Sequence, residues 1–264
     1  MTKPKPLVSV VITCYNYGQF LSEAIESVLS QSYKNIEIIV VDDGSTDNTK
    51  EAAGAYKGHK NFHYLYQENQ GVASARNIGL NNAKGTYLVF LDADDILKPE
   101  FVKVHLECLE QNTSIDYAYC LMKVFGRKEE AVAEILEFDP KLLVQRNFIH
   151  SSAMFRCNVI KKYRYDQKLQ ALEDWDLYLG LLENNHIGKL IPRELLLYRK
   201  HDALVSRSDS ILNAESQVGI NYSIYKKHPA LYPKGYATTY LLNRRARQIW
   251  QLVKSKVKGY AKKK

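Results

Sequence analysis

The 264-residue sequence contains no long apolar run, no signal-peptide core and no closely spaced cysteine pair, and each absence excludes a class of protein. A transmembrane helix needs about 20 consecutive apolar residues, so none is expected. Residues 1–6 lack the apolar core of a secretory signal peptide. The four cysteines are scattered without a C-x-x-C pair, which argues against a metal cage or a disulfide framework. These absences predict a cytoplasmic protein.

Acidic residues are absent from the last stretch, Arg244–Lys264, which carries nine Lys and Arg residues. The chain as a whole has a formal charge of +8, whereas the remaining residues carry 28 basic against 29 acidic side chains. A protein that binds nucleic acid through its fold usually spreads basic residues over a docking surface. Because the excess lies in the tail, no nucleic-acid partner is expected.

An apolar run that ends in carboxylates is the most informative stretch of the sequence. Residues 87–91 are aromatic or branched apolar, and Asp92, Asp94 and Asp95 follow directly. Such a run predicts a buried central strand whose acidic turn lies at the ligand-binding edge of an α/β sheet. Crowded carboxylates need a cation or a raised pKa, and oxygen ligands suit Mg²⁺ or Mn²⁺. Alternatively, these acids form a solvated turn that caps the helix after Pro99.

The first hundred residues predict strands that alternate with helices. Strands are expected at 7–13, 36–41 and 62–67, and helices over 21–29 and 71–83. This alternation indicates βαβ units and a mostly parallel sheet, in which the polar loops after the first, second and fourth strands share one edge. Within the second loop, Ser45 or Thr46 is expected to cap the following helix.

Taken together, several segments resemble the inverting family-2 glycosyltransferases, which have the GT-A fold. The resemblance covers roughly residues 6 to 205, in the expected order. Its segments are 8–16, 31–33, 40–47, 71–77, 90–95 and 172–177. It implies a Rossmann-like α/β fold with a mixed, mostly parallel sheet flanked by helices and a C-terminal helical extension.

The resemblance also implies a domain organisation. A glycosyltransferase domain is expected over 1–209, with a nucleotide-sugar-binding half at about 6–115 and an acceptor-binding half at 116–209. A basic helical extension is expected over 210–264.

On the donor side, the resemblance assigns the nucleotide sugar to a set of residues near the strand ends. They are Thr13, Tyr15, Asp43, Arg76, Asp92 and Ala93. A tyrosine ring can cover a pyrimidine, and a carboxylate can accept from the uracil N–H, so a UDP sugar is favoured. Arg76 suits the diphosphate or the ribose. From the residues alone, Tyr15 is equally a loop aromatic, Asp43 a helix cap and Arg76 a surface ion pair.

For the metal, the resemblance implies that Asp94 binds Mn²⁺ or Mg²⁺ directly. This ion would act as a Lewis acid on the diphosphate of the leaving group. His201 follows a predicted strand over 195–198 and is a second candidate ligand, although a lone histidine is often structural.

On the acceptor side, the resemblance makes Asp174 the general base and Glu173 a weaker second choice. Acids in the first turn of a helix are also stabilised by its dipole, which is a complete structural alternative. His150 and Ser151 are candidate acceptor-binding residues. Residues 162–167 depart from the Gly-Gly-Phe-Asp-Glu run that relatives often carry, so acceptor recognition stays open.

The basic C-terminal tail predicts an amphipathic helix. Its apolar residues recur at helical spacing, with Trp250 alongside: Leu242, Ala246, Ile249, Val253 and Val257. Such a helix suits an anionic membrane surface, which would place the protein at the inner face of the cell membrane. A solvated or oligomer-forming helix is the alternative.

The leading hypothesis is an inverting glycosyltransferase that uses a nucleotide sugar in cell-surface polysaccharide, lipopolysaccharide or glycolipid synthesis. The acceptor would be a saccharide or a lipid-linked molecule. The absence of Gly-x-Gly-x-x-Gly and Gly-Lys-Ser/Thr loops argues against dinucleotide-binding and P-loop enzymes. A sugar nucleotidyltransferase would carry a Gly-rich, arginine-containing loop after the first strand. A non-catalytic sugar-binding or scaffold module is the other alternative. The donor sugar, the acceptor and the oligomeric state stay open.

Overall fold

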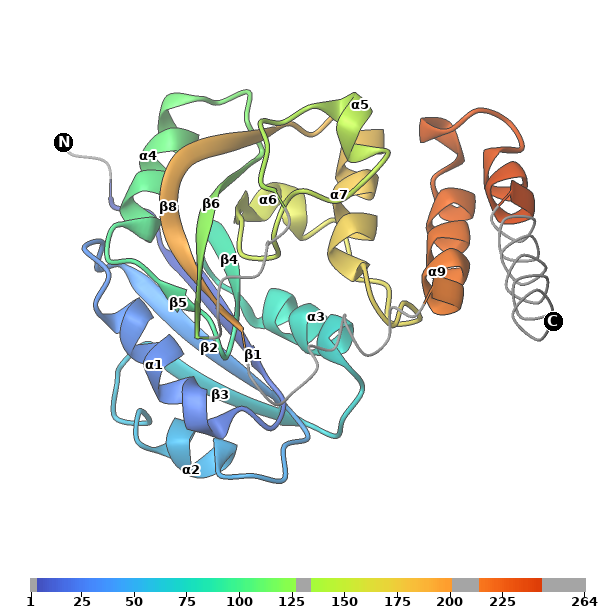
Figure 1. The fold of residues 1–264 in the computed structure, drawn as a ribbon. Coiled ribbons are helices and arrows are strands. Elements are labelled where there is room, and N and C mark those ends of the chain that lie inside the picture. Colours follow the sequence, from blue (N-terminus) through green and yellow to red (C-terminus); the bar gives the residue numbers. More distant parts are fainter. Residues whose placement is uncertain (1–3, 127–133, 201–213, 244–264) are drawn as a thin grey trace, which may run out of the picture. The chain divides into compact units, whose positions relative to one another are not determined.

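The computed structural model of the chain describes residues 4–126, 134–200 and 214–243 (Figure 1). The chain divides into two compact units, Met1–Ser206 and Arg207–Lys264, which are described separately below. The predicted boundary at residue 209 lies outside the described residues and stays a prediction.

The first unit contains a mixed eight-stranded sheet with the order β3-β2-β1-β4-β7-β6-β8-β5 among the described residues. Its strands are β1 (Val8–Cys14), β2 (Ile36–Asp43), β3 (Phe62–Gln67), β4 (Tyr87–Asp92), β5 (Ile96–Leu97), β6 (Tyr117–Gly126), β7 (Met154–Arg156) and β8 (Gly188–Lys200). The neighbouring strands among β1 to β4 pair in parallel, as do β6 and β8. Strand β7 pairs antiparallel with β4 and with β6, and β5 pairs antiparallel with β8. The predicted mostly parallel sheet is confirmed.

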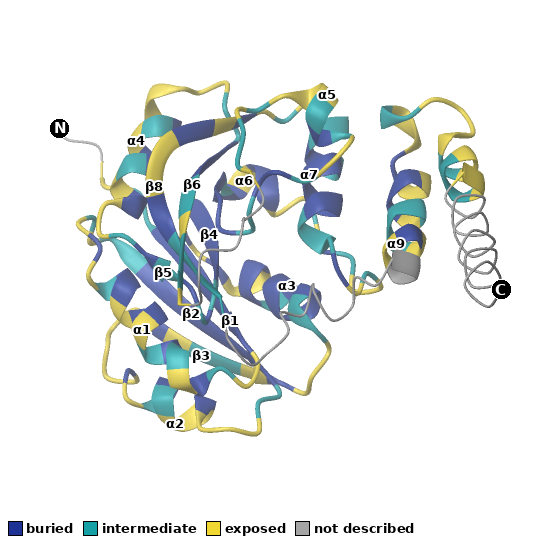
Figure 2. Ribbon diagram, viewed as in Figure 1, coloured by how far each residue is buried: buried dark blue, intermediate teal, exposed yellow. Residues whose placement is uncertain are grey.

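The central strands are buried along almost their whole length (Figure 2). Parallel strands covered by helices on both faces have continuous apolar sequences, and this explains the runs in β1, β2 and β4. One face packs on α1 (Gly18–Leu29), α2 (Thr49–Gly54) and α4 (Phe101–Gln111), whose apolar side chains share one core with those strands.

The opposite face of the sheet packs on α3 (Val72–Asn82). This helix approaches β1 so closely that a Cβ at Gly79 would lie 2.1 Å from Cγ1 of Val11. Only glycine fits at this position. Helix α3 therefore lies against the sheet at a depth set by Gly79, and Arg76 is carried one turn earlier on the same helix.

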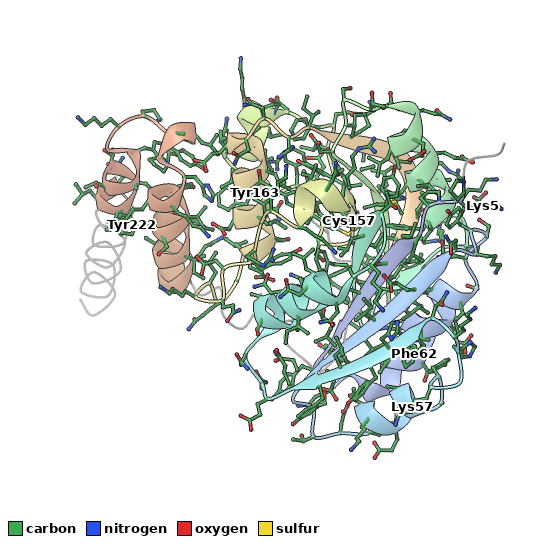
Figure 3. All side chains as sticks on the ribbon, turned by 180° about the vertical axis from the view of Figure 1, so that it is seen from behind. Lys5, Lys57, Phe62, Cys157, Tyr163 and Tyr222 are labelled. Atoms are coloured by element: carbon green, nitrogen blue, oxygen red, sulfur yellow. The ribbon has the colours of Figure 1, made fainter. Side chains whose placement is uncertain are left out.

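The remaining helices of the first unit are α5 (Pro140–Leu143), α6 (Cys157–Ile160) and α7 (Glu173–Glu183). All four cysteines are free thiols, and Cys14, Cys120 and Cys157 are buried. Figure 3 labels Cys157 among the side chains of the structure. Burial raises the pKa of Cys14 and of Cys157 to about 11. These thiols are therefore protonated at neutral pH and act as apolar packing groups.

Two local expectations were wrong. Helix α2 begins at Thr49, and it is Asp47, not Ser45 or Thr46, whose carboxylate accepts from the Thr49 N–H at 3.0 Å. Strand β5 separates the acidic turn from α4, so these acids do not cap that helix.

The second unit contains α9 (Ala214–Lys227) and a short 3₁₀ helix, η1 (Pro229–Leu231). Its ring of tyrosines centres on Tyr225, whose ring centroid lies 4.8 to 5.1 Å from those of Tyr232, Tyr236 and Tyr240. Of the predicted amphipathic helix, only Leu242 is described, and its side chain is 62% exposed. Within the described residues, no helix has both the length and the apolar character needed to cross a bilayer.

Candidate active site

The loops at the carboxyl ends of β1, β2 and β4 meet at one edge of the sheet. Thr13 Oγ1 donates to Asp92 Oδ1 at 3.1 Å, and the Ala93 N–H donates to the Thr13 carbonyl at 3.1 Å. Asn16 Oδ1 accepts from the Thr46 N–H at 2.8 Å, so the first and second loops are also joined. The sequence alternation therefore brings Thr13, Asp92 and Ala93 together as expected.

Asp43 fixes the loop that leads into α3. Its Oδ1 accepts from the Gln70 N–H at 2.8 Å and from the Gln67 side chain, and its Oδ2 accepts from the Gly71 N–H at 2.8 Å. The residue is only 3% exposed. Tyr15, in contrast, is 47% exposed on the loop after β1, where its ring is available to a ligand.

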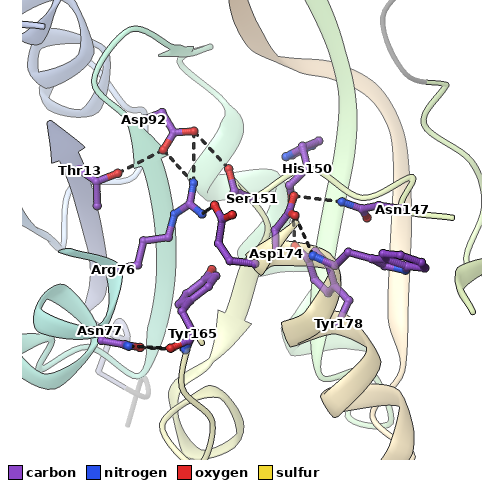
Figure 4. Close-up of polar contacts among 12 residues, drawn as sticks. Thr13, Arg76, Asn77, Asp92, Asn147, His150, Ser151, Tyr165, Asp174 and Tyr178 are labelled. Atoms are coloured by element: carbon purple, nitrogen blue, oxygen red, sulfur yellow. Dashed lines mark hydrogen bonds and ion pairs between the residues drawn. The ribbon is translucent and has the colours of Figure 1, made fainter. Parts of the chain in front are cut away.

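Arg76 is the centre of a largely buried ion network that links α3 and β4 to the start of α7 (Figure 4). Its Nη2 lies 3.0 Å from Asp92 Oδ1 and its Nη1 lies 2.8 Å from Glu173 Oε1, while the side chain is only 4% exposed. The guanidinium carbon lies 5.3 Å from the centroid of the Tyr165 ring. The alternative of a surface ion pair is therefore wrong. The Nε atom is buried and has no hydrogen-bond partner among the described residues.

Asp92 connects the donor-side loops with the segment before β7. Besides Thr13 and Arg76, it contacts Ser151, whose Oγ lies 3.5 Å from Asp92 Oδ2. Its side chain is 34% exposed, so the carboxylate is accessible to a ligand as well. The structure thus brings together Thr13, Arg76, Asp92 and Ser151 from four separate elements.

The acidic turn after β4 is held by Arg199 at the end of β8. The Arg199 N–H donates to Asp95 Oδ1 at 3.0 Å, and its Nε donates to the Asp94 carbonyl at 2.9 Å. The guanidinium also stacks between Phe20 and Phe125, with its carbon 4.6 Å and 4.3 Å from the two ring centroids. This clamp fixes the backbone that carries Asp94.

The same turn concentrates negative charge. Burial, followed by the neighbouring Asp94 and Asp92, raises the pKa of Asp95 well above its ordinary value. Burial and then the charges of Asp94 and Asp92 also raise the pKa of Tyr17 to about 12. Crowded carboxylates of this kind are relieved by a bound cation.

A divalent cation fits this donor set in chemical type, since Asp92 and Asp94 offer only oxygen ligands. Among the described residues, no three Asp, Glu, His or Cys side chains converge closely enough to form a complete metal site. The other predicted ligand, His201, lies outside the described residues.

Asp174 is the second residue of α7, and the helix begins directly after Leu172, which has the left-handed conformation at φ 63°. Its Oδ1 accepts from the Trp175 N–H at 2.7 Å, and its Oδ2 accepts from Asn147 Nδ2 at 3.0 Å. Burial and then Glu173 raise the pKa of Asp174 to about 6, against the opposing effects of Arg76 and both hydrogen bonds. A carboxylate that titrates just below neutral pH suits a general base.

The candidate acceptor residues differ from one another. Ser151 joins the Asp92 network, whereas His150 Nε2 lies 2.9 Å from the Cys120 carbonyl. Burial lowers the pKa of His150 to about 4, so its imidazole is neutral at pH 7. Its Nδ1 is buried and has no hydrogen-bond partner within the part of the chain that is described.

Three supporting residues were not identified from the sequence as site residues. Asn147 contacts Asp174, Tyr165 lies under Arg76, and Arg199 holds the acidic turn. All three lie within 116–209, the half expected to bind the acceptor, but no local pattern in the sequence marked them individually.

Comparison with sequence families gives one match to this chain. The family described as "Glycosyl transferase family 2" matches residues 9–164. A glycosyltransferase of Haemophilus influenzae is 37% identical over 185 residues, which is 67% of this chain and 72% of that protein. One of Methanocaldococcus jannaschii is 29% identical over 238 residues, covering 85% of this chain and 80% of the relative. Both relatives are described as uncharacterized.

Other relatives are longer. A Rickettsia felis glycosyltransferase is 31% identical over 194 residues, which is 71% of this chain and 32% of that protein. A Rickettsia conorii relative is also matched over 32% of its length. The chain therefore spans about a third of the length of these two curated relatives.

Solved structures share the fold at low sequence identity. Staphylococcus aureus TarS 1–349 in complex with UDP-GlcNAc is 19% identical, with a TM-score of 0.72, covering 90% of this chain and 72% of TarS 1–349. The Pyrobaculum calidifontis mannosyltransferase PcManGT, in complex with GDP-Man and Mn²⁺, is 17% identical with a TM-score of 0.63. This match covers 98% of this chain and 81% of that protein. At these identities, the likeness concerns the fold alone.

Proposed function

This chain belongs to glycosyl transferase family 2, and we propose that it transfers a sugar from a nucleotide-sugar donor to an acceptor hydroxyl with inversion. The observation that carries the proposal is the polar network from Asp92 through Arg76 to Glu173, beside Asp174. It links the donor-side loops to the start of α7, where the pKa of Asp174 is raised to about 6. Such a carboxylate is largely ionised at neutral pH and accepts a proton readily.

In the proposed reaction, Asp174 removes the proton from the acceptor hydroxyl. The acceptor oxygen then forms a bond to the anomeric carbon from the face opposite the leaving group. The bond between that carbon and the diphosphate oxygen breaks, and its electron pair stays on the nucleoside diphosphate. One displacement with one base inverts the anomeric centre. A base in this role typically contributes about 10²- to 10⁴-fold to the rate.

For donor recognition, we propose the residues at the strand ends. The exposed ring of Tyr15 suits stacking on a base, and Thr13 and Asp43 lie on the adjacent strand ends. Arg76 would act near the ribose or diphosphate, with Asp92 and Ala93 beside the donor sugar. A UDP sugar is the favoured donor. TarS has been solved with UDP-GlcNAc and PcManGT with GDP-Man, so the fold accommodates either base in relatives.

A divalent cation is part of the proposed site. Asp94, with Asp92 nearby and His201 as a further candidate, would hold Mn²⁺ or Mg²⁺. When bound, the ion would offset the charge of the departing diphosphate. The chain's own contribution is to hold the acidic turn in place through Arg199.

The acceptor is proposed to be a saccharide or a lipid-linked molecule on the side of His150, Ser151 and Glu173. We propose that this transfer serves cell-surface polysaccharide, lipopolysaccharide or glycolipid synthesis. We propose that it works in the cytoplasm at the inner face of the cell membrane, with the basic stretch Arg244–Lys264 on an anionic lipid surface.

The test is donor turnover. The full chain is incubated with UDP-, GDP- and dTDP-sugars and Mn²⁺, and release of the nucleoside diphosphate is measured. We expect slow hydrolysis of one class of donor and its loss in Asp94→Ala. Donor binding by thermal shift without any turnover would favour a sugar-binding module instead. Release of inorganic pyrophosphate from a sugar phosphate and a nucleoside triphosphate would indicate a nucleotidyltransferase.

A further inference from the structure

Asn147 has a fixed orientation toward Asp174. It lies between α5 and β7, and its Nδ2 donates to Asp174 Oδ2 at 3.0 Å. Its Oδ1 accepts from the Ile149 N–H at 3.1 Å. Because a backbone N–H can only donate, Oδ1 must face Ile149 and the NH₂ group must face Asp174. The amide therefore presents a donor, and never an acceptor, to the carboxylate.

The other carboxylate oxygen is held by α7 itself. The Trp175 N–H donates to Asp174 Oδ1 at 2.7 Å, and the Trp175 indole Nε1 donates to the Leu143 carbonyl at 2.7 Å. The indole thus fastens α7 to α5, from which the chain leads to Asn147. The carboxylate therefore accepts one hydrogen bond from the Asn147 side chain and one from the backbone of α7, and each of its oxygens keeps one further lone pair.

From this geometry we propose that Asn147 is a positioning residue that holds the Asp174 carboxylate in the orientation in which it accepts the acceptor's proton. This inference rests on the proposed function, in which Asp174 is the base. Asn147 acts only through Asp174. With both oxygens fixed before the substrate arrives, the carboxylate does not have to reorient during the reaction.

The charges around Asp174 explain why a donor is needed at this point. Glu173 on the same helix opposes ionisation of Asp174, and Arg76 on α3 favours it. Tyr165 and Tyr178 also face the group, and their phenols are neutral because burial raises the pKa of each. Besides Arg76, the ionised carboxylate is favoured by the Trp175 N–H and the Asn147 side chain. Of these two donors, only Asn147 can be changed by substitution without altering the helix backbone.

The test compares two substitutions that separate the roles of this amide. Asn147→Asp keeps the oxygen that accepts from Ile149 and places an acceptor against Asp174 Oδ2. Asn147→Ala removes both contacts. Gln145→Ala is the matched control, because Gln145 is in the same segment and its side chain donates to the Lys141 carbonyl, away from Asp174. Turnover is measured across pH 5 to 9. The Asp174 carboxyl carbon, assigned with Asp174→Asn, is titrated by ¹³C NMR.

We expect Asn147→Asp to shift the titration midpoint upward by about 1 pH unit or more. Turnover at pH 7 should fall about tenfold or more, because less of the Asp174 carboxylate is ionised and the ionised part is no longer held in the productive orientation. Asn147→Ala should cause a smaller shift of the midpoint and a smaller loss of turnover, and Gln145→Ala should match the wild type in both. A merely structural role predicts the reverse order, since Asn147→Asp keeps the contact with Ile149. The reverse order would overturn the positioning role of Asn147 and leave the proposed base in place. An unshifted midpoint in Asn147→Asp, with Asp174→Asn inactive, would do the same. Wild-type turnover in Asp174→Asn overturns the proposed base and this role together.

Discussion

Asp43 at the end of β2, Asp47 in the loop that follows and Asp174 at the start of α7 all accept hydrogen bonds, yet their burial and their partners differ. Asp43 is buried, Asp174 is partly buried and Asp47 is exposed. Asp43 accepts from the backbone N–H groups of Gln70 and Gly71. Asp47 accepts from those of Gly18 and Thr49, and although burial raises its pKa, hydrogen bonds led by that of the Thr49 side chain lower it overall. Asp174 instead has a raised pKa, because burial and Glu173 outweigh its hydrogen bonds.

The difference separates two uses of the same side chain. A carboxylate that accepts hydrogen bonds from the backbone fixes a loop, and at Asp47 these bonds also favour the ionised form. A carboxylate beside another acid titrates near neutral pH and is available to exchange a proton. The first use prepares the donor side of the site, and the second suits the proposed chemistry.

The largest expected effect is that of Asp174→Asn on turnover. The amide cannot accept the acceptor's proton, so we expect a loss of about 10²- to 10⁴-fold in transfer. Affinity for the donor should stay unchanged, because Asp174 is expected to contact only the acceptor. Transfer kinetics together with donor titration by calorimetry measure both quantities. A variant that loses donor binding and turnover in equal proportion would contradict the assignment.

Arg76→Met should destabilise the fold, because it leaves Asp92 and Glu173 without their shared cation. Removing one partner of a buried ion pair typically costs about 3 to 5 kcal/mol, and the partial exposure of Asp92 reduces this to about 3 kcal/mol or less. Arg76 also lowers the pKa of Asp174, so the acidic limb of the pH–rate profile should move to higher pH. Urea unfolding and the pH dependence of turnover check both effects.

The matched control for Arg76 is Arg193→Met. Arg193 pairs with Glu100, and both side chains are about half exposed. Exposed ion pairs contribute about 0 to 1 kcal/mol, so this variant should unfold almost like the wild type. If Arg76→Met and Arg193→Met lower the free energy of unfolding equally, the buried network contributes no more stability than an exposed ion pair.

Asp43→Asn should lower the stability of the fold without changing the pKa of Asp174. Its amide would turn a donor toward the N–H groups of Gln70 or Gly71, which leaves a buried donor unsatisfied at a cost of about 1 to 3 kcal/mol. Donor affinity should fall with the distorted loop, while the acidic limb of the pH–rate profile keeps its midpoint. The exposed Glu51→Gln serves as the control. A shifted limb in Asp43→Asn would mean that the two sides of the site are not electrostatically separate.

Much of this comparison could be predicted from the sequence. The apolar runs of β1, β2 and β4 are unbroken because parallel strands are covered on both faces, and their polar ends must then meet at one edge. The family resemblance, now supported by the match over residues 9–164, marked Asp92, Asp94 and Asp174 within one ordered set of motifs. The roles of these individual residues stay predictions.

The supporting contacts could not be predicted, because their partners are far apart in the chain. Asn147 and Asp174 are separated by 27 residues, and Arg199 and Asp94 by 105. The Thr46 contact was missed for the same reason, since its N–H donates to Asn16, 30 residues earlier, instead of starting a helix. Local propensity carries no information about such tertiary pairing. The burial of Arg76 could not be predicted either, and the alternative of a surface ion pair stayed open until the depth of α3, set by Gly79, was known.

The smallest expected effect is a change in stability with pH in Asp174→Asn, and its sign separates the two kinds of carboxylate. The pKa of Asp174 is about 6 in the folded chain and 3.8 in the reference state. The folded chain therefore binds more protons between these values, so this group favours folding as pH falls through 6 and opposes it above 6. Asn is neutral throughout, so the variant should gain stability relative to the wild type as pH rises.

Between pH 5 and pH 8 this relative gain should grow by about 1 kcal/mol, measured by urea unfolding at both values. Asp47→Asn provides the opposite case, because the folded chain lowers the pKa of Asp47. Its carboxylate contributes stability that is present above the unfolded pKa and is lost as pH falls through the folded value. The Asp47 variant should thus be less stable than the wild type at both pH 5 and pH 8. If both variants respond to pH in the same way, Asp174 is only another loop-fixing acid, and the proposed base must be sought elsewhere.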